Sequence, residues 1–359
     1  MKQSITAIVF VNNAISARMA LAVLQKDGVP LEHVALILIR KIHFDWFDKC
    51  GICLPYPRKP SLSLMGQWPF LKFYRDAASL LRRLLKSSQI KTVYLINFDN
   101  LLTNHVMNWA EKHREIEVCV LAEGLMNYQD IQIRNRAWWR SAYKILLTPL
   151  LGLRWRTPKG HLSGSFEPAV SRVIGFAPGV IAPPEKVEVI PFPVVAAARP
   201  PQADIALIAY TGIWQWMTED KFKLFAESFV TWLKSRNYRK LLVKPHPHYS
   251  EGPLEKLMPA HEVVKDTRNL EEMAGEIDAA TVISFNCTAL VTLKMIRPDL
   301  HCIDYGFDFY SVEAYKGDRS VEAILRASGV ELVPMIPSSE PALAVSGELQ
   351  LQRAGAPGE

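Results

Sequence analysis

The stretch Leu241-Leu242-Val243-Lys244-Pro245-His246-Pro247-His248 decides the fold. An apolar run that stops at Lys-Pro-His-Pro is typical of a buried parallel strand that ends at a rigid turn. The prolines on both sides of His246 restrict the backbone around it, so the imidazole has a defined direction. Ligands of open α/β sheets bind at the carboxyl ends of strands. The stretch therefore predicts an α/β sheet with a polar site at this strand end; ordinary loop histidines beside a proline-rich turn are the alternative.

Length and composition indicate a globular protein of two domains. The chain has 359 residues, which exceeds one typical core, and 49% of them are apolar against 22% charged. The net charge of +6 favours an anionic ligand or an anionic membrane surface. We see no secretory signal and no run near the ~20 apolar residues that span a bilayer. We therefore expect a cytoplasmic protein, with peripheral contact at the inner face of the inner membrane left open.

Cysteine and aspartate patterns give no metal site. The five cysteines are an odd number, which favours a reducing compartment with free thiols. Cys50 and Cys53 have the spacing of a zinc or redox pair, but no second pair follows. No Asp-x-Asp motif follows a suitable strand, and Asp304 and Asp308 are interpreted as structural. We expect neither a metal nor another cofactor.

Strands and helices alternate along the chain, which predicts parallel sheets built from βαβ units. In the first half, strands are expected at 6–11, 33–39, 92–96, 117–121, 172–176 and 187–190, and helices at 14–24, 70–85 and 104–113. Residues 41–68 show no clear period. In the second half, strands are expected at 205–210, 241–243, 279–284 and 300–304, with helices at 218–235 and between the last two strands.

A small, apolar, proline-bearing run at 194–204 predicts the linker between the domains. We expect an N-terminal domain at 1–196 and a C-terminal domain at 197–337. Residues 338–359 are rich in Ala, Gly, Pro and Ser, which predicts a disordered tail.

Two further polar motifs follow predicted strands. Glu123-Gly124 follows the apolar run at 117–121, where a carboxylate would face a ligand and glycine allows close backbone approach; an acidic turn residue is the alternative. Residues 284–290 (SFNCTAL) end another strand and open a helix, whose free N–H groups and dipole favour an anion. Ser284 and Thr288 are candidates for phosphate binding, for helix capping, or for both.

The segment 132–159, here called the basic-aromatic segment, holds seven basic residues and no acidic one. The basic residues are Arg134, Arg136, Arg140, Lys144, Arg154, Arg156 and Lys159, interleaved with Trp138, Trp139, Tyr143 and Trp155. This pattern fits an anionic membrane interface or an anionic acceptor. It gives no recognisable nucleic-acid reader motif, so we expect no nucleic-acid partner. A solvated, partly packed helix and loop is the alternative.

The set of motifs resembles that of bacterial sialyltransferases and polysialyltransferases. Ala122-Glu123-Gly124 resembles their acidic-acidic-glycine motif, and His246-Pro247 is similar to their His-Pro motif. Ser284 with Cys287-Thr288 is similar to their serine motifs. The resemblance spans roughly 118–305, with two departures: Ala122 replaces the first acidic residue, and Cys287 stands where a serine is usual. It implies a GT-B α/β fold, in which two Rossmann-like domains face a central cleft.

The resemblance also implies a metal-independent, inverting transfer of sialic acid or another nonulosonic acid from a CMP donor. Glu123 would be the general base and His246 would act on the leaving phosphate. The donor-binding candidates are Gly124, Thr211, Gly212, Lys244, Pro247, Ser284, Asn286, Cys287 and Thr288. The acceptor, a bacterial glycan or glycolipid of capsule or lipopolysaccharide, would meet Asn12, Arg134 and Arg136.

Three alternatives stay open. Transferases of Kdo, another nonulosonic acid carried on CMP, also have acid-glycine and His-Pro elements. A UDP-sugar epimerase of the same architecture is a second alternative. A non-catalytic glycan- or nucleotide-binding relative is the third, and the replacement of the first acidic residue by Ala122 favours it.

Overall fold

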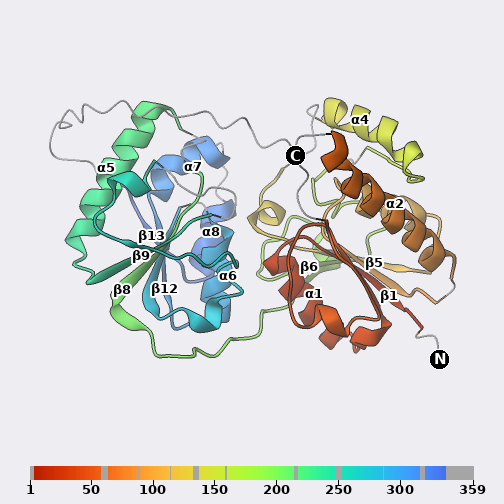
Figure 1. Ribbon diagram of the computed structural model, residues 1–359, viewed down its shortest axis with the longest axis horizontal. Coiled ribbons are helices and arrows are strands. Elements are labelled where there is room, and N and C mark those ends of the chain that lie inside the picture. The colour runs from red at the N-terminus through yellow and green to blue at the C-terminus, as the bar shows by residue number, and fades with distance from the viewer. Residues whose placement is uncertain are drawn as a thin grey trace. The chain divides into compact units, whose positions relative to one another are not determined.

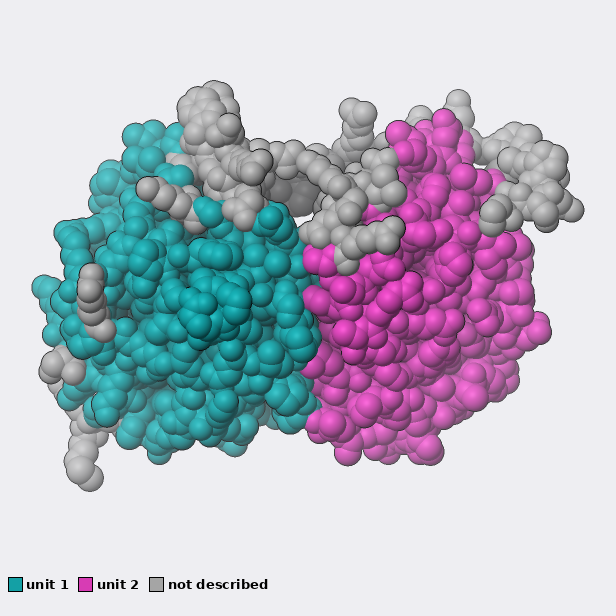
Figure 2. All heavy atoms as spheres, turned by 180° about the vertical axis from the view of Figure 1, so that it is seen from behind, with its two compact units in different colours: residues 1–193 teal, residues 194–359 magenta. Residues whose placement is uncertain are grey.

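The computed structural model describes residues 4–57, 64–87, 89–113, 115–131, 137–157, 160–213, 217–246, 253–285, 287–315 and 320–336. Of residues 64–68, 137–141 and 312–315 it describes the backbone alone. The chain forms two compact units, unit 1 at residues 1–193 and unit 2 at 194–359, which Figure 2 shows in different colours. The predicted tail at 338–359 lies outside the described residues.

Unit 1 is a seven-stranded parallel sheet with helices packed against it (Figure 1). The strand order is β3-β2-β1-β4-β5-β6-β7. The strands are β1 (Ala7–Val11), β2 (Val34–Leu38), β3 (Ile52–Leu54), β4 (Thr92–Leu95), β5 (Glu117–Leu121), β6 (Arg172–Gly175) and β7 (Val187–Val189). The helices are α1 (Ala14–Lys26), α2 (Leu64–Lys86), α3 (Leu101–Ala110) and α4 (Ala137–Leu150). Every residue of β1 and β2 is buried, as expected for strands covered on both faces.

Unit 2 is a six-stranded parallel sheet with the order β10-β9-β8-β11-β12-β13. The strands are β8 (Gln202–Ala209), β9 (Lys240–Lys244), β10 (Glu262–Val263), β11 (Ala279–Ser284), β12 (His301–Tyr305) and β13 (Glu331–Val333). The helices are α5 (Glu219–Ser235), α6 (Thr288–Ile296), α7 (Phe307–Tyr315) and α8 (Ser320–Ala327). Residues 241–244 form most of β9, which pairs with β8, and β8 pairs in turn with β11 in the centre of the sheet.

The first crossover shows how local sequence starts a helix at the carboxyl end of a strand. After β1, Asn13 caps α1: its side chain accepts the N–H of Ser16 at 2.8 Å, and the Ser16 hydroxyl accepts the N–H of Asn13 at 3.1 Å. This capping box satisfies backbone donors that a helix leaves free. It also leaves the Asn13 amide group pointing to a neighbouring strand end.

The structure contains elements that are not expected from the sequence, at 41–68, at β10 and after β12, where α7, α8 and β13 lie. The segment 41–68 contains β3 and the first turn of α2. Strand β3 has three residues, none of them buried, and it pairs at the sheet edge with β2. A strand without a buried apolar run has no alternation to detect. Strand β8 begins at Gln202, inside the run predicted as linker.

Candidate active site

Three neighbouring strands of unit 1 bring polar side chains together at their carboxyl ends. Asn12 follows β1, Asn97 lies two residues after β4, and Glu123 lies two residues after β5. Since β1, β4 and β5 are adjacent and parallel, these ends meet at one edge of the sheet. The structure therefore brings Asn12 and Glu123, both expected at a site from the sequence, into one cluster.

Both oxygens of the Glu123 carboxylate accept a hydrogen bond from an asparagine. Asn97 Nδ2 donates to Oε1 at 3.0 Å, and Asn12 Nδ2 donates to Oε2. A carboxylate has about four lone-pair directions, so two protein donors leave room for a substrate hydroxyl. The side chain is only partly buried. The arrangement fixes the carboxylate while leaving acceptor capacity.

The orientation of both amides is set by their own partners. The Asn97 Oδ1 accepts the backbone N–H groups of Asp99 at 3.1 Å and Asn100 at 3.2 Å. The Asn12 Oδ1 accepts the Ser16 hydroxyl at 3.1 Å. Reversing either amide would give up these bonds, so each presents its NH₂ group to Glu123. Two fixed donors favour an ionised carboxylate over a carboxylic acid, which would itself have to donate.

The backbone of Glu123 is held from two sides. Its N–H donates to Oδ1 of Asn127 at 2.9 Å, and its carbonyl accepts Asn13 Nδ2 at 2.8 Å. Asn127 lies in the 3-10 helix Leu125–Tyr128 and is buried. Gly124 is extended and starts that turn, with φ at 160°. The main chain around the carboxylate is thus held by the cap residue of α1 and by a side chain of the turn that follows Glu123.

Opposing effects set the pKa of Glu123. Burial raises the pKa of this carboxyl above the ordinary glutamate range, while hydrogen bonds from Asn97 and Asn12 and the positive charge of Arg40 act to lower it. Burial wins. A glutamate of raised pKa is a stronger base than an exposed one once it is ionised, which suits a group that removes a proton near neutral pH.

In unit 2 the predicted residues follow three adjacent strands. His246 lies beyond β9, Thr211 and Gly212 follow β8, and Ser284 ends β11. The sheet order places β9, β8 and β11 side by side, so these residues lie at one edge. His246, Thr211 and Gly212 are partly exposed. This edge resembles the arrangement in unit 1: short polar motifs at neighbouring strand ends.

Two of these candidates make framework contacts. The Ser284 hydroxyl is fully buried and donates to the carbonyl of Ala209 at 2.7 Å, which joins β11 to β8. Lys244 is also buried, and its Nζ donates to the carbonyl of Asp266 at 2.5 Å. Burial lowers the pKa of Lys244, against the charges of Asp266 and Glu272. The direct donor contacts expected of both side chains stay predictions.

The start of α6 carries the second donor motif. The helix begins at Thr288 after Cys287, and both residues are partly exposed. Burial raises the pKa of the Cys287 thiol to about 11, so the thiol is protonated at neutral pH and is no nucleophile. The Thr211 hydroxyl donates to the carbonyl of Phe285 at 2.6 Å, which ties the end of β8 to this turn.

Four expected contact residues lie outside the described residues: Pro247, Asn286, Arg134 and Arg136. Their roles stay predictions. Conversely, sequence reasoning missed three polar residues that hold Glu123, namely Asn13, Asn97 and Asn127, and Ser16, which orients Asn12. Asn97 was detectable, because it directly follows the predicted strand 92–96. Asn127 lies in a turn that gives no sequence signal.

Two of the three described basic side chains of the basic-aromatic segment are ion-paired within unit 1. Lys144 is buried and ion-paired with Asp99 at 2.6 Å. Arg156 is paired with Glu111 and Glu167, at 2.5 Å each. The positive charges of Lys144 and Arg156 are therefore neutralised within the protein and are not available to bind an acceptor or a membrane. Arg154 is exposed.

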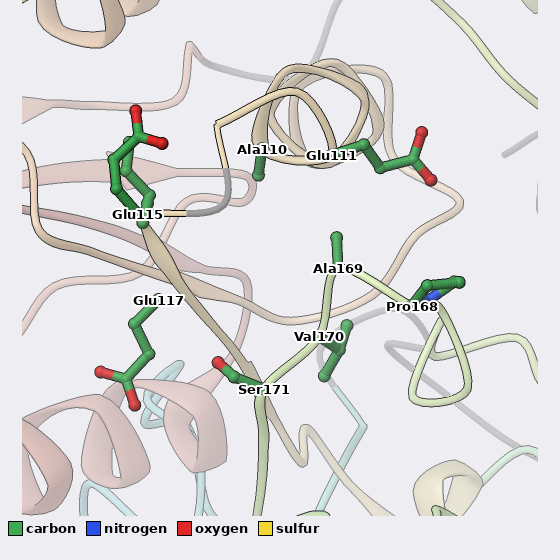
Figure 3. Close-up of a pocket in the computed structure, with 9 residues that line it drawn as sticks. Ala110, Glu111, Glu115, Glu117, Pro168, Ala169, Val170 and Ser171 are labelled. Carbon is green, nitrogen blue, oxygen red and sulfur yellow. The ribbon is translucent and has the colours of Figure 1, made fainter.

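A pocket of about 610 Å³ lies at the opposite edge of the unit 1 sheet (Figure 3). It is lined by Glu111, Glu115 and Glu117, whose carboxylates point in separate directions. Glu117 starts β5, whereas Glu123 follows its end. Glu111 and Glu117 are ion-paired with Arg156 and Arg172. Nowhere in the described part of the chain do three or more His, Cys, Asp or Glu side chains form a group that could hold a metal.

No protein-family model matches the chain, and no curated protein matches its sequence. Solved structures do match its fold. A putative UDP-N-acetylglucosamine 2-epimerase from Listeria monocytogenes is 7% identical, with a TM-score of 0.52 over 92% of this chain and 84% of that one. The glycosyltransferase of kitacinnamycin is 12% identical, with a TM-score of 0.49 over 92% of this chain and 87% of that one.

At such low identity the likeness to the Listeria structure concerns the fold alone. Two parallel sheets, each in its own α/β unit, match the architecture of that neighbour. The chain therefore has the two-domain α/β architecture of GT-B proteins, which confirms the fold class expected from the sequence. None of the described helices is long and apolar enough to cross a membrane.

Proposed function

We propose that the protein is an inverting glycosyltransferase that moves a nonulosonic acid from a CMP donor to a bacterial surface glycan. Sialic acid is the first candidate for that nonulosonic acid. The observation that carries the proposal is the fixed carboxylate of Glu123. Its two oxygens are held by Asn97 and Asn12 at the carboxyl ends of adjacent strands, and it remains partly exposed. Such a group can accept a proton from an acceptor hydroxyl without reorganising.

In this reaction the acceptor oxygen forms a bond to the anomeric carbon while the bond from that carbon to the CMP phosphate breaks. The hydroxyl proton passes to Glu123, and CMP leaves with inversion at the carbon. Negative charge grows on the phosphate as the bond breaks. His246 would stabilise or protonate that phosphate, and the N–H groups at the start of α6, beside Thr288, would hold its oxygens.

Support for the donor side is the shared edge of β9, β8 and β11 in unit 2. This edge carries His246, Thr211 and the turn that leads to α6. Parallel α/β sheets bind nucleotides outside the carboxyl ends of their strands, beside helix N-termini. CMP as the nucleotide rests on the motif resemblance, as does sialic acid as the sugar. Transfer of Kdo from CMP is the alternative within the same chemistry.

Slow donor hydrolysis tests the donor class. CMP-Neu5Ac, CMP-Kdo and UDP-GlcNAc are incubated separately with the full-length protein in the presence of EDTA, and released nucleotide is measured. Release of CMP from one CMP-sugar is the expected result. Turnover of UDP-GlcNAc instead would indicate a UDP-sugar enzyme such as an epimerase. If no donor is hydrolysed and none binds by calorimetry, the protein is better explained as a non-catalytic binding protein than as an enzyme.

A further inference from the structure

In the part of helix α4 whose side chains are described, 142–150, two polar side chains are buried and four large apolar or aromatic side chains are exposed. Lys144 and Thr148, one turn apart, are exposed by only 6% and 2%. Leu146 and Leu150, also one turn apart, are exposed by 75% and 79%, and Tyr143 and Ile145 are exposed beside them. A helix on the surface of a water-soluble protein normally has the reverse pattern. Contiguous exposed apolar side chains of this kind mark an interaction surface.

The rotation of α4 is fixed by its buried face. Lys144 Nζ contacts Asp99 Oδ1 at 2.6 Å and its backbone carbonyl at 2.8 Å, and lies 4.7 Å from the ring centre of Trp155. Turning the leucines inward would pull Lys144 away from all three contacts. The outward apolar face is thus a stable feature of the fold.

Helix α2 runs beside α4 in the same direction (Figure 1). Toward one end, Tyr143 of α4 is close enough to Tyr74 of α2 to contribute to the raised pKa of that phenol, which is mainly due to burial. Toward the other end, the Arg82 guanidinium lies 3.3 Å from where a Cβ on Gly152 would stand, just past α4. The two helices therefore present one joint surface.

The charge of this surface is strongly basic. Among its described side chains, α2 exposes five cations and one anion: Lys72, Arg75, Arg82, Arg83 and Lys86 against Asp76. The basic-aromatic segment that contains α4 has no acidic residue. A second copy of this chain docked on the same face would bring the two sets of cations together, which is unfavourable. An anionic lipid surface complements both the charge and the apolar side chains.

We propose that α4 and α2 dock the protein on an anionic membrane surface, with Leu146 and Leu150 inserted at the headgroup boundary and the α2 cations against the lipid phosphates. This inference is independent of the donor chemistry. Lys144 and Arg156 of the basic-aromatic segment take no part in this membrane contact, because both are ion-paired within unit 1. The helix lies on the bilayer and does not cross it.

Vesicle co-sedimentation of the full-length protein tests the inference. Phosphatidylcholine vesicles are compared with vesicles that also contain phosphatidylglycerol. Binding is expected only to the anionic vesicles at low salt, and it should weaken toward 1 M salt, where the screening length falls to about 3 Å. Leu146→Asp with Leu150→Asp should lower the partition coefficient roughly tenfold or more. Arg82→Gln with Arg83→Gln should lower it roughly 30-fold, since each of the two surface charges contributes about 1 kcal/mol.

Leu224→Asp is the matched control, since Leu224 is an exposed leucine on α5, in unit 2. It should bind vesicles like the wild type. If the double variant Leu146→Asp, Leu150→Asp does not fold, the milder double variant Leu146→Ser, Leu150→Ser is used instead. Unchanged binding of the α4 variant would overturn the inference, as would absence of wild-type binding. A wild-type dimer that the α4 variant turns into a monomer, without vesicle binding, would assign the face to a second copy instead.

Discussion

Lys144 Nζ lies 2.6 Å from Oδ1 of Asp99, and this ion pair between a buried lysine and a partly exposed aspartate connects helix α4 to the cluster around Glu123. The N–H of Asp99 donates to Oδ1 of Asn97 at 3.1 Å, and Asn97 Nδ2 donates to Glu123 Oε1 at 3.0 Å. The outer helix, the turn after β4 and the proposed base thus form one chain of contacts. We infer that Lys144 and Asp99 position the carboxylate without touching a substrate.

Lys144→Met should disturb this chain. We expect the free energy of unfolding to fall by about 1.5–3 kcal/mol, because hydrogen bonds to a charged group are lost. Turnover should fall roughly tenfold with little change in donor KM, since the base is misplaced but the donor residues are untouched. Urea unfolding and steady-state kinetics measure both effects, and Lys144→Arg should recover part of them. Full turnover in a destabilised Lys144→Met protein would make the ion pair purely structural.

Asn97→Ala should move the acidic limb of the pH–rate profile. The Asn97 hydrogen bond acts to lower the pKa of Glu123, so its removal raises that pKa further. The base must be ionised to act, so activity should then appear only at higher pH than in the wild type. Turnover at pH 6 should fall more than turnover at pH 9. Asn108→Ala, which removes an asparagine on α3, is the control and should leave the acidic limb unchanged. If the acidic limb of Asn97→Ala is also unchanged, Glu123 is not the group whose ionisation sets that limb.

His246→Ala should lower turnover by on the order of 10² or more, because the leaving phosphate loses its partner. CMP release under saturating donor is the measurement. His301→Ala is a suitable control, since His301 starts β12 at the other edge of the same sheet and pairs with Glu331. A loss of less than threefold in His246→Ala would contradict its proposed role.

Arg172→Gln should change how stability depends on pH. Burial acts to raise the pKa of Asp27, but hydrogen bonds from Arg172 and Tyr94 outweigh it and the pKa is lowered. Burial likewise acts to raise the pKa of Glu188, but hydrogen bonds from Lys26 and Arg172 outweigh it and that pKa is lowered too. Lowered carboxyl pKa values stabilise the fold above the unfolded-state pKa, near 4, and this stability is lost as pH falls through the folded-state values. The variant should lose about 1.5–3 kcal/mol at pH 7 and show a flatter acid decline.

Urea midpoints at pH 7 and pH 3 measure this effect. Arg239→Gln, at the exposed Asp204 pair, should change neither, because surface ion pairs contribute little. If Arg172→Gln loses the same free energy of unfolding at pH 7 and pH 3, Asp27 and Glu188 do not contribute to the loss of stability in acid.

The fold was predictable where apolar runs are long and their ends are marked. β1 and β2 are continuous buried runs and β11 is buried at all but one residue, and the sequence placed all three within one residue at either end. β3 and β10 were not predicted, because they are two- or three-residue strands with no buried residue. Their pairing comes from the strand beside them, which a local pattern does not contain.

Glu123 and Asn12 were singled out from the sequence, whereas Asn13, Asn97 and Asn127, which also hold Glu123, were not. Glu123 follows an apolar strand directly, so its place at a sheet edge can be read from the chain. Asn12, Asn13 and Asn97 are neutral amides in turns, where asparagine is common for local reasons. Only the sheet order, with β4 between β1 and β5, shows that Asn12 and Asn97 meet the same carboxylate and that Asn13 meets the backbone of the same residue. Long-range adjacency of this kind is absent from a single sequence.

The measurement that tests the account most directly compares Glu123→Gln with the wild type for sugar transfer and for CMP binding on the same preparations. Glu117→Gln, at the other end of β5, is the matched control. The account predicts that Glu123→Gln loses transfer and binds CMP with nearly unchanged affinity, while Glu117→Gln keeps both. Unchanged transfer by Glu123→Gln would contradict the proposal that this carboxylate is the catalytic base.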